Sequence, residues 1–287
     1  MSTSNTIPAP FPARIGLGTW KMGESRAARA QEVTVVSEAL QLGYRLINTA
    51  EMYGDGGAEE VVGAALKEAQ APREQLCIVS KVLPNNASRR GTIKACEASL
   101  KRLQCGYLDI YLLHWRGSFE FTETLDAFAE LQQRGLIRRF GVSNLDVRSL
   151  QRWKTAEQQL GLRDTLCTNQ VHYCISERGI EFDLLPWQRE QGISTMAYSP
   201  LGLGDLAQHP LLKKIGAAHA GGAITAAQVA LAWVLRYPEV VAIPKTAKTQ
   251  RLLENLQAAQ LQLSEAELAQ IDAVFPPPTR KQPLAMI

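Results

Sequence analysis

Long hydrophobic runs are missing from this sequence, which limits the classes of protein that it can encode. No stretch approaches the ~20 consecutive apolar residues that a membrane-spanning helix needs. The first residues, MSTSNTIPAPFPAR, lack the apolar segment of a secretory signal. We therefore expect a cytoplasmic protein with no membrane partner.

A cluster of charges of one sign is missing too. The 287 residues carry a formal net charge of +3, and acidic and basic residues are interspersed along the chain. A nucleic-acid-binding protein would show a clustered basic face, so we expect no nucleic-acid partner. With 46% hydrophobic and 21% charged residues, the composition is that of an ordinary globular protein.

Cysteine is scarce, and its spacing argues against several kinds of chemistry. The five cysteines form no CxxC pair and have no metal-ligand spacing. We expect reduced, buried thiols and no metal site. The sequence shows no Ser/His/Asp triad, and no GxGxxG motif follows a predicted strand. Hydrolysis, metal catalysis and a Rossmann-type dinucleotide site are therefore poorly supported.

What the sequence does contain is a set of strands that end in chemically active side chains. The stretch RLINTAEMYGDGG, residues 45–57, begins as a short buried strand with Asn48 near its end and Tyr53 just after it. The strand IVSK ends at Lys81, and DIYLLHW carries His114 near its end. In a chain of alternating strands and helices, chemistry gathers at the carboxyl ends of the strands. These four side chains are therefore the candidate catalytic groups.

Strands and helices alternate along the whole chain. Short apolar runs predict strands, and apolar residues at helical spacing predict a helix after each strand. The strands are expected at residues 13–20, 45–50, 76–82, 107–115, 137–144, 166–173, 193–201 and 240–246. The helices are expected at residues 27–41, 56–69, 90–103, 121–135, 146–160, 179–192 with an interruption at Pro186, 225–237 and 250–260. Eight such units predict an α/β fold, the (β/α)8 TIM barrel.

Two segments are additional to the eight units. An insert from Gly202 to Gly222 follows the seventh strand and should lie over the barrel mouth. A further helix at residues 264–275 is followed by a Pro-rich tail that ends in Met286 and Ile287. No linker or change of composition divides the chain, so residues 1–287 are expected to form a single domain with this C-terminal helix and tail. Mouth loops set specificity in such barrels.

Tyr53, Lys81 and His114 together predict acid catalysis at a carbonyl group. A tyrosine is a poor proton donor at neutral pH, because its reference pKa is about 10. A nearby ammonium group lowers that pKa, so Tyr53 beside Lys81 would be a tuned general acid. His114 would add a hydrogen-bond donor that orients the carbonyl oxygen. An acid without a nucleophile or metal needs a reagent, and a hydride-donating cofactor would serve.

An ordered set of motifs resembles the aldo-keto reductase family over nearly the whole chain. INTAEMYG resembles the family's signature around its catalytic tyrosine, and VSKV and LLHW resemble the strands that carry its lysine and histidine. IPKTAKTQRLLEN resembles its cofactor clamp, and GVSN, TNQVHY and AYSPLG fall where the family contacts nicotinamide and pyrophosphate. Among subgroups, the chain resembles bacterial reductases of small aldehydes, including methylglyoxal and other 2-oxoaldehydes.

The resemblance implies a role for each matching residue. Tyr53 would donate the proton to the carbonyl, Lys81 would tune the pKa of Tyr53 and His114 would position the substrate. Trp20 and Trp115 would complete a pocket for a small carbonyl compound. NADPH would be held by a longer set of residues: Gly18, Thr19, Trp20, Asn48, Ser143, Asn144, Gln170, Tyr198, Ser199, Leu201, Gly202, Lys245, Thr246, Arg251, Glu254 and Asn255.

Three groups within this set would hold different parts of the cofactor. Ser143, Asn144 and Gln170 would hold the nicotinamide carboxamide, and Tyr198 would stack on the ring. Ser199, Leu201 and Gly202 would approach the pyrophosphate. Lys245, Thr246 and Arg251 would surround the 2′-phosphate, with Glu254 and Asn255 at the adenine. Charge-assisted hydrogen bonds to that phosphate would favour NADPH over NADH.

One position departs from the family pattern. Where the family places an aspartate that pairs with its lysine, this chain has Asn48, which has nearly the same shape but no charge. An unneutralised Lys81 would lower the pKa of Tyr53 further, whereas a Lys81 without its partner would itself have a lower pKa. Sequence alone leaves the sign open, and we expect a weakened but not abolished reductase.

Two other interpretations of the sequence stay open. Some members of this fold are regulatory subunits or sensors of nicotinamide redox state, so the chain is alternatively a non-catalytic cofactor-binding protein. An unrelated barrel with a cofactor such as PLP would need a Schiff-base lysine and a pyridine partner, and it is poorly supported. No coiled-coil heptads are visible, so we expect a monomer.

Overall fold

Eight parallel strands form one sheet whose order follows the sequence. The structure, a computed structural model, describes residues 10–219 and 224–287. In sheet order the strands are β1 (Leu17–Gly18), β2 (Leu46–Asn48), β3 (Cys77–Val82), β4 (Leu108–Leu113), β5 (Ile137–Ser143), β6 (Leu166–His172), β7 (Ser194–Tyr198) and β9 (Val240–Ala242). The short strand β8 (Pro200–Leu203) lies outside this sheet.

The first and last strands of the sheet meet, which closes it into a barrel. A parallel bridge joins Ile15, just before β1, to Ala242 of β9. The guanidinium of Arg14 donates hydrogen bonds across the same seam to three backbone carbonyls between residues 235 and 240. The predicted (β/α)8 fold is therefore confirmed.

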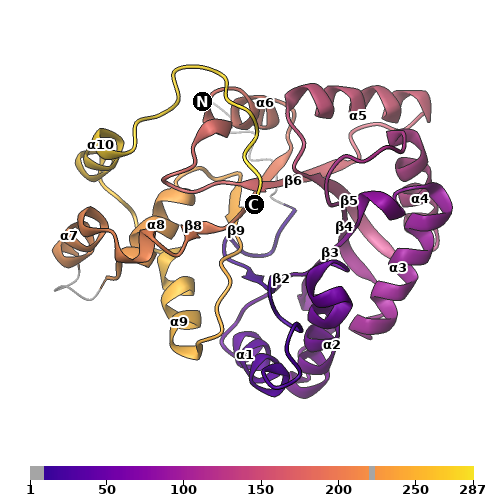
Figure 1. Cartoon of the computed structure of the whole chain (residues 1–287), viewed down its shortest axis with the longest axis horizontal. Helices are drawn as coiled ribbons and strands as arrows, with labels where there is room; N and C mark the ends of the chain where they lie inside the picture. Colours follow the sequence, from indigo (N-terminus) through magenta and orange to yellow (C-terminus); the bar gives the residue numbers. More distant parts are fainter. Residues whose placement is uncertain (1–9, 220–223) are drawn as a thin grey trace, which may run out of the picture.

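Helices cover the outside of the barrel, as Figure 1 shows. Their bounds are α1 (Arg29–Gln41), α2 (Gly57–Ala69), α3 (Arg89–Leu103), α4 (Phe121–Gln133), α5 (Val147–Gln159), α6 (Leu184–Glu190), α7 (Pro210–Ala218), α8 (Ala226–Val234), α9 (Thr249–Ala258) and α10 (Glu265–Val274). None of the helices in the described ranges is long and apolar enough to cross a membrane.

The strand period of two divides the core into two layers. Outward-facing side chains such as Ile47 and Ile78 pack against the helices, and inward-facing ones such as Leu46, Val79 and Ile110 fill the barrel. Both layers are fully buried, which is the expected environment of a parallel sheet.

Two predicted segments differ from the structure. The sixth helix breaks before Pro186, into a 3-10 turn at Gly179–Glu181 and α6. Pro186 is tolerated because it lies in the first turn of α6, where backbone N–H groups have no helical partner. The insert contains α7, which packs against α8 and α10 on the flank of the barrel (Figure 1), so most of it does not cover the mouth. Its residues 220–223 lie outside the described residues.

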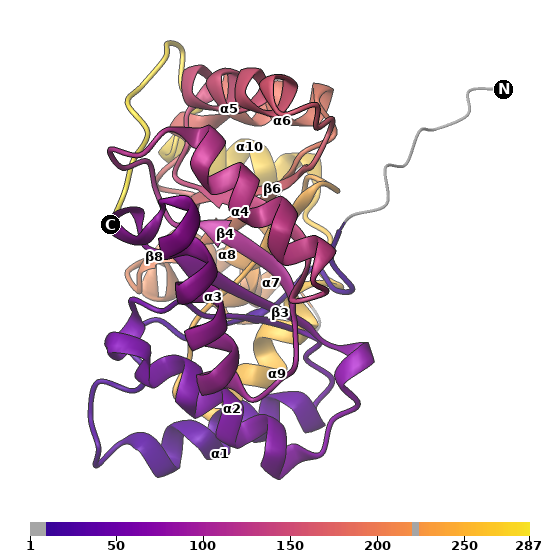
Figure 2. The same ribbon diagram turned by 90° about the vertical axis from the view of Figure 1, so that its right-hand side faces the viewer.

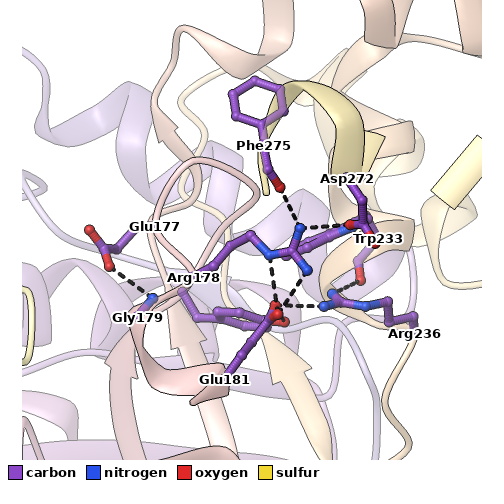
Figure 3. A network of polar contacts seen from close by, with 9 residues as sticks. Glu177, Arg178, Gly179, Glu181, Trp233, Arg236, Asp272 and Phe275 are labelled. Carbon is purple, nitrogen blue, oxygen red and sulfur yellow. Dashed lines mark hydrogen bonds and ion pairs between the residues drawn. The ribbon is translucent and has the colours of Figure 1, made fainter. Parts of the chain in front are cut away.

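The C-terminal tail returns to the barrel after α10. Figure 2 shows it running along one face of the molecule to the chain end, which in Figure 1 lies within the ring of strands. Lys281 contacts Asp183 at 2.9 Å on the way. Arg178 fixes α10 before the tail, through its bonds to Asp272 and to the carbonyl of Phe275 (Figure 3).

Candidate active site

The strand period explains why three polar side chains reach the barrel interior. Asn48 shares the inward face of β2 with Leu46, and Lys81 shares that of β3 with Val79. His114 follows β4 directly and continues the inward series of Ile110 and Leu112. All three are buried near the carboxyl ends of their strands.

A tight turn brings the fourth side chain to the same place. Tyr53 begins a 3-10 turn, Tyr53–Gly56, that leads into α2. Gly54 in this turn has φ of +57°, and a Cβ there would lie 2.8 Å from the carbonyl oxygen of Met22. Glycine is therefore required for the close approach, which holds the phenol against the barrel opening.

Tyr53, Lys81 and His114 lie close together in the structure. The Nζ atom of Lys81 donates to the phenolic oxygen of Tyr53 at 3.1 Å and to the backbone oxygen of Thr49 at 2.8 Å. The rings of Tyr53 and His114 meet edge to face, with centroids 5.8 Å apart. Trp115 lies against His114 at 4.7 Å. The three groups thus share one buried space.

Asn48 takes a different partner from the lysine. Its Oδ1 accepts a hydrogen bond from Nε2 of Gln170 at 2.8 Å. The described contacts of Lys81 do not include Asn48. The neutral amide therefore belongs to a chain of polar groups across the barrel and leaves the ammonium without a carboxylate beside it.

Burial controls the proton affinities in this space. Desolvation raises the pKa of Tyr53, although the amide of Asn48 counteracts part of that rise. Desolvation also lowers the pKa of Lys81 well below its usual value, with a smaller opposing effect from Glu59. Burial thus acts on both groups, because it raises the pKa of Tyr53 and lowers that of Lys81.

His114 is held neutral. Desolvation and then the charge of Lys81 lower its pKa to about 2. Its Nδ1 atom is buried and has no hydrogen-bond partner in the described structure. An uncharged imidazole with a free ring nitrogen is suited to binding an oxygen atom brought into the site.

The residues expected at the nicotinamide form one hydrogen-bonded group. Ser143 Oγ donates to the backbone oxygen of Gln170 at 2.8 Å. Asn144 Nδ2 donates to Ser143 Oγ and to the carbonyl of His114, both at 3.2 Å. The hydroxyl of Tyr198 donates to Asn144 Oδ1 at 3.0 Å. These groups from β4, β5, β6 and β7 therefore line one side of the opening.

The opposite side is formed by β1. Gly18 has no room for a side chain, because a Cβ there would lie 2.7 Å from the carbonyl oxygen of Ile243. Thr19 is fully buried and its hydroxyl donates to the backbone oxygen of Asn48. Trp20 is half-buried, with the ammonium of Lys21 4.7 Å from its ring.

The expected phosphate-binding residues stand outside the barrel. Lys245 and Arg251 are exposed, and neither takes part in an ion pair within the described ranges. Thr246 is buried, with its hydroxyl beside the backbone of Lys248. Ser199, Leu201, Gly202 and Glu254 are partly exposed. Two exposed cations, Lys245 after β9 and Arg251 in the first turn of α9, fit a bound phosphate.

Asn255 fits the prediction less well. Its side chain is buried and bonds to the hydroxyl of Tyr44, which itself donates to the carbonyl of Leu252. It therefore helps to tie α9 to Tyr44, which precedes β2.

Three residues of the site escaped the sequence analysis. Thr49 provides a backbone acceptor, which no side-chain pattern reveals. Glu59 lies six positions after Tyr53 and influences Lys81 from outside the barrel. His172 was not among the expected site residues, yet its ring stacks on Tyr198 with planes 10° apart. Alternation along β6, two residues beyond Gln170, was the signal for His172.

A closed (β/α)8 barrel with these polar groups at its strand ends has the architecture of a barrel enzyme. The model of the aldo/keto reductase family matches residues 14–275. The chain belongs to the aldo/keto reductase family.

Similar proteins extend over nearly the whole chain. Methylglyoxal reductase YeaE of Escherichia coli is 48% identical, over 95% of this chain and 94% of its own length. Glyoxal reductase of Bacillus subtilis is 36% identical, over 94% of this chain and 90% of its own length. An aldo-keto reductase from Klebsiella pneumoniae, solved in complex with NADPH, has a TM-score of 0.89 and 46% identity, covering 96% of this chain and 95% of its own.

Proposed function

We propose that this protein reduces small aldehydes or ketones to alcohols with NADPH, and that 2-oxoaldehydes such as methylglyoxal are its substrates. The observation that carries the proposal is the buried contact of 3.1 Å between Lys81 Nζ and the hydroxyl of Tyr53. The similarity to a methylglyoxal reductase and a glyoxal reductase supports the substrate class.

The residues present fit the cofactor. Ser143, Asn144 and Gln170 would hold its carboxamide, with Tyr198 against its ring. Lys245 and Arg251, which take part in no ion pair among the described residues, would bind its 2′-phosphate. The Nδ1 atom of His114, which has no hydrogen-bond partner among the described residues, is a buried polar atom that is still available in the site. When bound, NADPH supplies the hydride.

The side chains of the site supply the proton and orient the carbonyl group of the substrate. The hydroxyl of Tyr53 donates its proton to the carbonyl oxygen of the substrate, and the Lys81 ammonium stabilises the phenolate that remains. Neutral His114 binds the same oxygen and fixes its position. Trp20 and Trp115 form walls that exclude water, which strengthens these electrostatic interactions.

Asn48 weakens this arrangement without abolishing it. A carboxylate at this position would keep Lys81 charged, whereas the amide bonds to Gln170 and leaves the lysine pKa lowered. Because turnover needs the charged ammonium, activity should fall as pH rises through that lowered pKa. Asn48→Asp raises the lysine pKa and should extend activity to higher pH. Identical pH profiles for the two proteins would show that the charge is irrelevant.

The central experiment is NADPH oxidation over a panel of aldehydes, ketones and 2-oxoaldehydes. We expect turnover of 2-oxoaldehydes and a loss of about 10²–10⁴-fold in kcat for Tyr53→Phe. NADPH affinity, measured by calorimetry, should stay unchanged in that variant. Turnover that survives the loss of the phenol would refute the assigned proton donor.

A second candidate function is that of a non-catalytic sensor of nicotinamide redox state. The neutral residue at position 48 favours it, since the site lacks the charge beside Lys81. It predicts tight NADPH binding without turnover of any carbonyl in the same panel.

We further propose a cytoplasmic monomer in which residues 1–287 act as one domain. The five free cysteines suit a reducing compartment. Light scattering tests the monomer.

A further inference from the structure

Lys81 is a fully buried cation whose direct partners are all neutral. Its Nζ atom contacts the backbone oxygen of Thr49 and the hydroxyl of Tyr53. Among the described ion pairs none involves Lys81, and Asn48 brings no charge. A buried lysine without a counter-charge tends to lose its proton. The site therefore needs a negative charge from elsewhere if the ammonium is to persist.

Glu59 is a buried acid on the other side of the same strand. It belongs to α2 and its side chain is fully buried. Its Oε1 accepts a hydrogen bond of 2.5 Å from Ser80, the residue directly before Lys81. Since neighbouring side chains in a strand point to opposite faces, Ser80 bonds to this carboxylate on the outer face of β3, whereas Lys81 points inward.

We propose that Glu59 is a positioning residue for Lys81: its carboxylate, held behind β3 by Ser80, supplies the counter-charge that position 48 lacks. The effect crosses one strand through a low-dielectric core, where charges act over longer distances than in water. The catalytic meaning of this role rests on the proposed reduction, whereas the electrostatic link between the two side chains does not.

The other charged and titratable groups around Lys81 agree with this role. Tyr53 and His114 face the ammonium and are neutral at pH 7. Arg102 of α3 binds Glu59 through Nε at 2.6 Å and offsets part of its field. Glu59 is the acid that raises the lysine pKa, although burial outweighs it. The link is thus present but incomplete, as expected for a carboxylate shared with a guanidinium.

The test is a double-mutant cycle with four proteins: the natural chain, Glu59→Gln, Asn48→Asp and the double variant. The first readout is the midpoint of the basic limb of kcat against pH, with NADPH saturating. Glu59→Gln should lower this midpoint by about one pH unit in the natural chain, and by less than about 0.3 unit beside Asp at position 48. A purely structural role predicts equal shifts in both backgrounds and overturns the proposal.

Two control variants separate charge from packing. Glu60→Gln removes an acid one position along α2, where it is half-exposed and paired with Arg29, and it should leave the midpoint in place. Ser80→Ala removes the hydrogen bond and keeps the Glu59 charge, so its shift should be smaller than that of Glu59→Gln. A larger shift would assign the effect to the hydrogen bond and overturn the charge mechanism.

A second readout does not depend on turnover. NMR titration of the Lys81 side chain in ¹³C-lysine-labelled protein without cofactor should give the pKa order Asn48→Asp, natural chain, Glu59→Gln, from highest to lowest. If this order is found but the protein shows no turnover, the proposed function is wrong and the electrostatic effect of Glu59 on Lys81 is still supported. If Glu59→Gln does not fold, Ser80→Ala carries the test instead, because it releases the carboxylate from β3; an unchanged Lys81 pKa in that variant counts against the proposal.

Discussion

The imidazole of His114 is buried beside an ammonium, and both features disfavour its charged form. Its pKa falls from an ordinary 6.5 to about 2 in the folded protein. The unfolded chain therefore binds a proton more readily than the folded one between these values. The stability that His114 contributes is complete above pH 6.5 and is lost as pH falls toward its folded pKa.

We expect this loss to be measurable by urea unfolding between pH 6 and pH 4. In that range His114 should reduce the free energy of unfolding by about 1.4 kcal/mol per pH unit. His114→Asn should flatten the pH dependence by that amount. An unchanged slope in His114→Asn would place the acid sensitivity elsewhere.

The positions of site residues could be predicted from the sequence where the alternation of side chains along a strand determines them. Because side chains alternate between the two faces of a strand, Asn48, Lys81 and His114 all point into the barrel, and this placement followed from the sequence. Their proton affinities did not follow, because the sequence gives the neighbours along a strand but not the depth of burial. The partner of Asn48 was also hidden, since Gln170 comes from β6, 122 positions away.

At the scale of elements, helix positions followed from the spacing of apolar residues. The fifth helix was expected at residues 146–160 and lies at Val147–Gln159, with Asp146 capping its first turn. The inserted helix α7 escaped prediction, because its apolar face packs on α8 and α10, partners that no local pattern reveals. The 3-10 turn before α6 escaped for a similar reason, since Arg178 bonds to Asp272 and Glu181 to Arg236, both from distant parts of the chain.

The attachment of α10 depends on Arg178. Figure 3 shows its guanidinium between Glu181 and Asp272, with Trp233 alongside. Arg178 also donates to the carbonyl of Phe275, where the tail begins. Because this residue is buried, removal of its charge leaves Glu181 and Asp272 without their shared partner.

We expect Arg178→Met to reduce the free energy of unfolding by about 2–4 kcal/mol, less than the loss of an isolated buried ion pair, because Arg236 still pairs with Glu181 and Asp272 is partly exposed. Hydrogen exchange should accelerate in residues 265–287 before it does so elsewhere. The end of the tail, Ile287, contacts the Tyr198 hydroxyl, so KM for the aldehyde should rise as well. Lys281→Met, which removes an exposed contact, should cost less than about 1 kcal/mol. Equal effects of the two variants would contradict this assignment.

At the scale of the whole molecule, the barrel closes through a short seam. Strands β1 and β9 have only two and three residues, whereas β5 and β6 have seven each. The sequence predicted longer strands at both ends, because apolar residues continue beyond the paired segments. Closure joins residues more than 220 positions apart, as in the bridge from Ile15 to Ala242, and no local pattern encodes such a contact.

Arg14 compensates for the short pairing at the seam. Its Nη2 atom lies 2.6 Å from the carbonyl oxygen of Leu235 and 2.7 Å from that of Tyr237, and its Nε lies 3.0 Å from that of Val240. Hydrogen bonds from a charged donor each contribute about 1.5–3 kcal/mol. The three together fix the segment that leads into β9 and so hold the last strand against the first.

Arg14→Met should therefore reduce the free energy of unfolding by about 2–4 kcal/mol, less than the sum of three bonds because water rehydrates some of the carbonyls. The free energy of unfolding of Arg14→Lys should lie between those of the unchanged protein and Arg14→Met, since one ammonium cannot reach all three acceptors in the same geometry. Arg29→Met, at an exposed pair with Glu60, should cost less than about 1 kcal/mol. Urea unfolding measures all three, and hydrogen exchange in residues 240–246 locates the effect. A seam that stays protected in Arg14→Met would mean that strand pairing alone closes the barrel.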